Sequence, residues 1–181
     1  VELSTMLLFL AAFVLEGGST ALATAPLRLF FDFLCIAGLT VIFVIDLRDM
    51  VVFDSVTLPL LAAAFVINLV LGHSAANLLL ATAIGGGFFL LQYVVSGGRW
   101  IGGGDIRIGA MMGAMLGFPN ILLALLAAYV IGAVTALGLL SLGKARWSGQ
   151  MAFGTFLSVA TILTLFFGGP LIAWYGSLLA F

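Results

Sequence analysis

Long apolar runs alternate with short polar or glycine-rich breaks along the whole chain, and this pattern predicts membrane helices. A helix that crosses a bilayer needs about 20 mainly apolar residues. The clearest runs lie at 27–45, 56–71, 76–95, 121–142 and 151–167. A shorter run, 3–15, would span only if tilted, and a last apolar segment follows a break at Gly168-Gly169-Pro170 and reaches Phe181.

Small and polar residues mark the expected loops between these runs. The loops lie at 17–26, 46–55, 72–74, 96–104, 118–120 and 143–150. The remaining segment, 105–117, carries Gly109, Gly113 and Gly117 on one helical face, a spacing that permits close helix packing in lipid. Together the segments predict an all-α fold, a polytopic transmembrane helical bundle of about 6–8 membrane helices. We expect one domain over residues 1–181.

Composition supports a membrane protein and narrows its chemistry. Hydrophobic residues make up 64% of the chain and charged residues 7%, whereas a soluble domain is about 25% charged. The net charge of −1 gives no indication of a nucleic-acid partner. Cys35 is the single cysteine and His73 the single histidine, so neither a disulfide nor a cysteine–histidine metal site is expected. We expect the lipid bilayer as the surroundings, with no metal and no cofactor.

The basic residues predict how the chain is oriented. If the spans alternate, Arg28 falls on one side of the membrane and the other basic residues fall on the opposite side. Those residues are Arg48, Arg99, Arg107, Lys144 and Arg146. The positive-inside rule places that side in the cytoplasm. The carboxylates of Asp46, at the end of one span, and Asp105, at the start of another segment, then lie at the same cytoplasmic face.

Two carboxylates at one membrane face suggest a specific reaction. When two carboxylates are held close, they cannot both ionise easily, so the pair can share a proton. One carboxylate then activates water against a peptide carbonyl while the protonated partner donates to the carbonyl oxygen and the leaving amine, as in aspartic proteases. Gly102, Gly103 and Gly104 precede Asp105, and glycines allow another backbone to approach closely.

Simpler interpretations of the same carboxylates remain open at this point. Asp105 could be the N-cap of a helix, because aspartate is favoured there and suits the helix dipole. Asp46 and Asp49 could be interfacial anchors that pair with Arg48. The four-residue GxGD pattern alone does not separate these possibilities from catalysis.

Three segments resemble one family. GGGDIRIGAMMGAMLG resembles the GGGDxKL-type segment of type IV prepilin peptidases, the bacterial members of the GxGD membrane aspartyl proteases. VIFVIDLRDMVVFDSVTLPLL is similar to that family's first aspartate segment, and AFGTFLSVA resembles its later FGPFL segment. The three matches occur in the family's order and together cover roughly residues 40–165.

The resemblance implies roles for individual residues. Asp46 matches the first catalytic aspartate and Asp105 the second. Gly102 and Gly104 match the glycines of GxGD, and we group Gly103 with them as part of a substrate-facing loop. Asp54 matches the non-catalytic Asp of an (I/L)PD sequence, and Arg107 stands for the family's usual lysine, keeping the charge. We therefore expect Asp54 and Arg107 to belong, with these glycines, to the substrate-facing loop region.

Other positions depart from the family pattern. Phe53 and Thr155 each stand where the family usually has proline. The sequence also contains no N-terminal region with paired CxxC zinc motifs, which in many members goes with N-methylation of the cleaved pilin. We therefore expect either a short, peptidase-only form or a chain whose front end lies outside this sequence, and in both cases no methyltransferase activity from this chain.

The resemblance implies a membrane aspartic endopeptidase that removes the leader peptide from type IV prepilins or pseudopilins, after a glycine. It would act at the cytoplasmic face of the inner membrane as a multi-pass protein. One alternative is a GxGD protease that acts on another membrane-inserted precursor. A second is a small proton or cation transporter subunit, although such proteins often carry charges at the bilayer midplane and inverted repeats, and neither is visible here.

Overall fold

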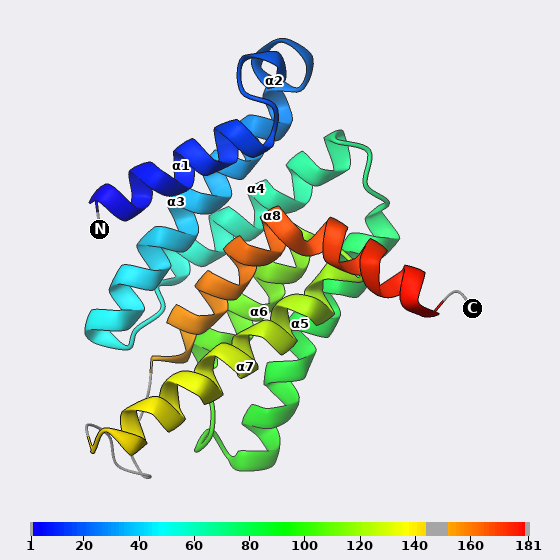
Figure 1. The fold of residues 1–181 in the computed structure, drawn as a ribbon. Coiled ribbons are helices and arrows are strands. Elements are labelled where there is room, and N and C mark those ends of the chain that lie inside the picture. The colour runs from blue at the N-terminus through cyan, green and yellow to red at the C-terminus, as the bar shows by residue number, and fades with distance from the viewer. Residues whose placement is uncertain (1, 144–151, 180–181) are drawn as a thin grey trace.

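The computed structural model describes residues 2–143 and 152–179 of the chain, and these residues form an all-α bundle (Figure 1). No strand occurs among them. The helices are α1 (Glu2–Leu15), α2 (Ser19–Thr24), α3 (Pro26–Asp49), α4 (Asp54–Val70), α5 (Ala75–Ser96), α6 (Gly103–Leu116), α7 (Asn120–Ser141) and α8 (Phe153–Leu179). The predicted fold class is confirmed.

Four of the described helices, α3, α5, α7 and α8, are long and apolar enough to cross a membrane. The helices α1 and α4 are apolar but shorter, with 14 and 17 residues. The chain is therefore a multi-pass membrane protein. Large apolar side chains cover much of its outer surface, as expected where lipid tails replace water as the solvent.

The predicted break at Gly168-Gly169-Pro170 is wrong, because α8 continues through it to Leu179. Proline removes one backbone hydrogen bond, but membrane helices tolerate it where neighbouring helices and local adjustments satisfy the freed groups. Figure 1 shows α8 changing direction between its orange and red parts, as a proline or glycine kink would produce. The expected loop at 17–26 also differs, since it contains the short helix α2.

The helix α6 lies at the centre of the bundle and packs against α4, α5, α7 and α8 (Figure 1). Its closest neighbour is α5. A Cβ atom added to Gly109 would lie 2.5 Å from the carbonyl oxygen of Gly85, and one added to Gly113 would clash with the backbone of Ala81. The predicted close packing is confirmed for these two glycines. Gly117 has another role: it ends α6 in a left-handed conformation, with φ of +68°.

Polar and apolar contacts together hold α6 in place. Ile108, Met111 and Met112 of α6 are fully buried. Near its other end, the side-chain amide of Asn68 on α4 donates to the carbonyl oxygens of Ala114 and Met115, at 2.8 and 3.0 Å. A short helix fixed on several sides can position a side chain in its first turn with little freedom. That side chain is the carboxylate of Asp105.

Candidate active site

Asp46 lies in the last turn of α3, and the beginning of α8 holds its carboxylate. The side chain is buried, and Oδ2 accepts a hydrogen bond of 2.8 Å from the backbone N–H of Thr155. A Cβ atom on Gly154 would lie 2.8 Å from the same oxygen, so glycine at this position lets the carboxylate reach the helix end. The first turn of α8 presents unpaired backbone N–H groups, which attract a carboxylate. The segment Phe153–Thr155 thus helps to position the Asp46 carboxylate.

Asp105 lies at the third position of α6 and is 9% exposed. Its Oδ2 accepts a 3.1 Å hydrogen bond from the backbone N–H of Gly102, which is the N-cap residue. Burial raises the pKa of Asp105 to about 6, the Gly102 hydrogen bond opposes this, and the negative charge of Asp46 adds to it. Asp105 is therefore not the N-cap residue of α6. It contributes to capping from the third helical position, by accepting from the N–H of the N-cap Gly102. Asp105 and Asp46 both line the same pocket.

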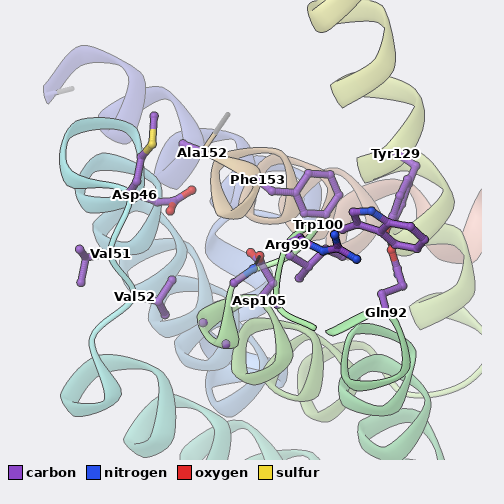
Figure 2. Close-up of a pocket in the computed structure, with 16 residues that line it drawn as sticks. Asp46, Val51, Val52, Gln92, Arg99, Trp100, Asp105, Tyr129, Ala152 and Phe153 are labelled. Atoms are coloured by element: carbon purple, nitrogen blue, oxygen red, sulfur yellow. Dashed lines mark hydrogen bonds between the residues drawn. The ribbon is translucent and has the colours of Figure 1, made fainter. Parts of the chain in front are cut away.

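Both carboxylates line one pocket of about 940 Å³ (Figure 2). The linker after α3, the loop before α6, the start of α8 and side chains of α5 and α7 form its wall. The other lining residues are Met50, Val51, Val52, Gln92, Gly98, Arg99, Trp100, Ile101, Gly102, Gly103, Gly104, Tyr129, Ala152 and Phe153. The volume lies within the range of sites that enclose a ligand. The pocket can therefore hold a segment of peptide beside the two aspartates.

The glycines before Asp105 have different environments. A Cβ atom on Gly104 would lie 2.6 Å from Val52, so this glycine allows the linker after α3 to pack against the start of α6. A Cβ atom on Gly103 would meet no atom within 4 Å. Backbone access for a ligand is therefore greatest at Gly103. Gly104 is explained by packing within the protein, and Gly102 by its position as N-cap.

Asp54 and Arg107 form an ion pair with each other near the N-terminal ends of α4 and α6. Both side chains are substantially exposed, at 51% and 42%, and neither lines the pocket. An exposed ion pair of this kind contributes about 0–1 kcal/mol. The structure thus shows these two residues joining α4 to α6. Among the described residues that line the pocket, Arg99 is the basic one.

Sequence reasoning missed Gln92 and Tyr129, which line the pocket from α5 and α7. The Tyr129 hydroxyl donates a 2.8 Å hydrogen bond to Oε1 of Gln92. Both residues lie inside long apolar runs and belong to none of the recognised segments. A polar amide within a membrane helix is nevertheless a signal of function, and that signal could have been used.

No group of three or more histidine, cysteine, aspartate or glutamate side chains that could hold a metal ion occurs within 2–143 and 152–179. His73 lies in the turn between α4 and α5, and Asp54 lies at the opposite end of α4. Asp46 and Asp105 are the carboxylates among the described residues that line the pocket.

Two buried aspartates share one pocket in this helical membrane bundle, and aspartic proteases likewise use two carboxyl groups in one site. The chain belongs to the type IV leader peptidase family, whose model matches residues 33–137. That match includes both Asp46 and Asp105.

Curated relatives agree with this assignment. A protein named prepilin leader peptidase/N-methyltransferase from Burkholderia pseudomallei (strain 1026b) is 34% identical over 169 residues, which cover 87% of this chain and 55% of that protein. Proteins of the same name from Aeromonas salmonicida (strain A449) and Pectobacterium carotovorum subsp. carotovorum are each 30% identical, over 72% and 93% of this chain and 47% and 60% of their own lengths. The chain thus spans about half the length of the curated relatives it matches. No solved structure gives a significant match.

Proposed function

We propose that this protein is a membrane aspartic endopeptidase that cleaves the leader peptide from type IV prepilins or pseudopilins. The observation that carries the proposal is the placement of Asp46 and Asp105. Both are buried, both line one pocket, and each is held by a backbone N–H at a helix end. Membership of the type IV leader peptidase family supports the same conclusion.

The geometry supplies the parts of an acid–base reaction. Because Asp46 and Asp105 are both buried and line one pocket, one proton shared between them is favoured over two negative charges. The ionised carboxylate takes a proton from water, which attacks the scissile carbonyl. The protonated carboxylate donates to the carbonyl oxygen and then to the leaving amine. An extended substrate can approach over Gly103, where the backbone has no neighbouring atom in the way.

The proposed location is the cytoplasmic face of the inner membrane. Arg48, Arg99 and Arg107 lie at the end of the bundle that contains the pocket, whereas Arg28 lies at the opposite end of α3. The positive-inside rule assigns the pocket end to the cytoplasm. Lys144 and Arg146, which were also expected there, lie outside the described residues.

Conservative replacement of each aspartate tests the dyad. In a reconstituted chain incubated with a prepilin-type precursor, Asp46→Asn and Asp105→Asn should each lower the cleavage rate by about 100-fold or more, because each removes an acid–base group. Asp49→Asn is the matched control, since Asp49 is an exposed acid on the same turn of α3. It should retain the wild-type rate.

Mass spectrometry of the product identifies the bond that is cut. The proposal predicts a new N-terminus directly after the leader's terminal glycine. Near-normal cleavage by either asparagine variant would refute the dyad. Cleavage by the wild type of other membrane-inserted precursors, with no cleavage of prepilins, would refute the proposed substrate class and leave the dyad intact.

A further inference from the structure

The pocket extends well beyond the two aspartates. Figure 2 shows Asp46 and Asp105 on one side of it and Gln92, Trp100 and Tyr129 on the other. A volume of about 940 Å³ is near the upper end of the range for ligand sites and exceeds the space that one peptide bond requires. The side opposite the aspartates must therefore contact a different part of any substrate that fills the pocket.

Gln92 and Tyr129 form a hydrogen-bonded pair on that side. The Tyr129 hydroxyl donates to Gln92 Oε1 at 2.8 Å, and Gln92 Nε2 donates to the carbonyl oxygen of Phe88 at 3.4 Å, a long bond. A side-chain amide has two N–H donors, and a phenol oxygen accepts hydrogen bonds as well as donating one. Among the described residues, the pair therefore retains one N–H donor on Gln92 and one acceptor oxygen on Tyr129.

Aromatic contacts fix this pair relative to the aspartates. The Tyr129 ring makes edge-to-face contacts with Phe88 and Phe153, with ring centroids 5.7 and 5.1 Å apart. Phe153 begins α8, and Thr155, two residues later, donates to Asp46. The pair is thus held at a defined place with respect to the Asp46 carboxylate.

We propose that Gln92 and Tyr129 bind the main chain of the extended substrate segment beside the scissile bond. The Gln92 amide N–H donates to a substrate carbonyl oxygen, and the Tyr129 oxygen accepts from a substrate N–H. Each peptide residue offers one donor and one acceptor, and these groups are costly to bury in a pocket unless they are paired. The proposal rests on the proposed peptidase function and adds how the substrate backbone is held.

Two isosteric variants separate this role from a structural one. Tyr129→Phe removes the hydroxyl and Gln92→Met removes the amide while keeping the side chain's length. With a synthetic prepilin-type precursor peptide and the full chain in detergent, each should raise KM about 3- to 10-fold, as expected for one lost hydrogen bond, with kcat nearly unchanged. Tyr175→Phe is the control, because Tyr175 is 59% exposed on α8 and does not line the pocket.

A second measurement keeps the test valid if a variant is less stable. In a series of precursor peptides, each backbone amide near the cleavage site is replaced in turn by an ester, which removes one N–H. The wild type should lose affinity about 3- to 10-fold at one position, and Tyr129→Phe should lose nothing further at that position. If the Gln92–Tyr129 hydrogen bond merely joined α5 to α7, the KM of each variant would equal that of the wild type. The loss of affinity from each ester and the effect of Tyr129→Phe would then add at every position.

The outcomes distinguish this proposal from the one on which it rests. If the wild type cleaves the precursor but both variants have the wild-type KM, or their losses add to those of the ester peptides, the backbone site is refuted and the peptidase is not. If the wild type cleaves no precursor, the peptidase proposal fails and this one fails with it.

Discussion

Three effects with opposite signs set the pKa of Asp105. Burial favours the neutral acid, and so does the negative charge of Asp46, whereas the hydrogen bond from Gly102 favours the carboxylate. The result is a pKa of about 6, above the ordinary value of 3.8. A raised carboxyl pKa is useful for sharing a proton, but it makes the ionised form costly to bury in the folded state.

Because burying the ionised Asp105 carboxylate costs free energy, we expect Asp105→Asn to stabilise the protein at neutral pH. The folded state holds the Asp105 proton more tightly than the unfolded state, so stability due to this group is present below pH 3.8 and is lost as pH rises through about 6. The difference corresponds to about 3 kcal/mol at most. The asparagine carbonyl can still accept from Gly102, so the neutral replacement avoids the cost and keeps the cap.

Thermal unfolding in detergent between pH 4 and pH 8 checks this prediction. The Tm of Asp105→Asn should exceed that of the wild type at pH 7.5, and the difference should disappear near pH 4. Asp49→Asn, at an exposed position, should follow the wild type throughout. A lower Tm for Asp105→Asn at pH 7.5 would show that burial of this carboxylate is not destabilising.

Among the helices, the contact between α5 and α6 determines where Asp105 lies. Gly109 and Gly113 allow the two backbones to approach so closely that a Cβ atom at either glycine would meet backbone atoms of α5. In lipid, such packing of small residues replaces the hydrophobic effect as the force that joins helices. Because Asp105 lies in the first turn of α6, any separation of α5 and α6 changes the geometry of the pocket.

Gly113→Ala should therefore disturb both stability and activity. Its Cβ atom would meet the backbone of Ala81, which cannot move aside as a flexible side chain can. We expect a loss of about 1–3 kcal/mol in unfolding free energy, together with slower cleavage as α6 shifts. The same substitution at Gly87 of α5 is the control, since a Cβ atom there meets no atom within 4 Å. Equal behaviour of the two variants would contradict the packing argument.

For the whole molecule, the distribution of charge predicts an orientation. The pocket end carries Arg48, Arg99 and Arg107, and the turn that contains His73 lies at the opposite end of α4 from Asp54. The pocket end should then face the cytoplasm and the turn should face the other side of the membrane.

Cysteine labelling with a membrane-impermeant maleimide tests that orientation. His73→Cys should react in cells whose outer layers are removed but whose inner membrane is intact, and Trp100→Cys should react only after that membrane is opened. The background is low because Cys35, the one native cysteine, is fully buried. The unsubstituted chain measures that background, and labelling of Trp100→Cys before opening would reverse the predicted orientation.

Local patterns in the sequence were sufficient to predict the helices, the bundle class and the family. Runs of apolar residues report membrane helices because each helix satisfies its own backbone and needs only a minimum length of apolar side chains. The glycine spacing in α6 likewise predicted its close packing, because residues four apart share a helical face. The break expected at Pro170 was wrong because membrane surroundings let a helix continue through proline.

Tertiary structure alone decided what surrounds each carboxylate. The sequence marked Asp46 and Asp105, but the N–H that holds Asp46 comes from Thr155, far along the chain. The partnership of Gln92 with Tyr129 likewise joins α5 to α7. Such neighbours depend on how helices rotate and pack against each other, and no local pattern of residues encodes that. By itself, the sequence determined most of the membrane helices and which acids are unusual; only packing decided that the two acids share one pocket.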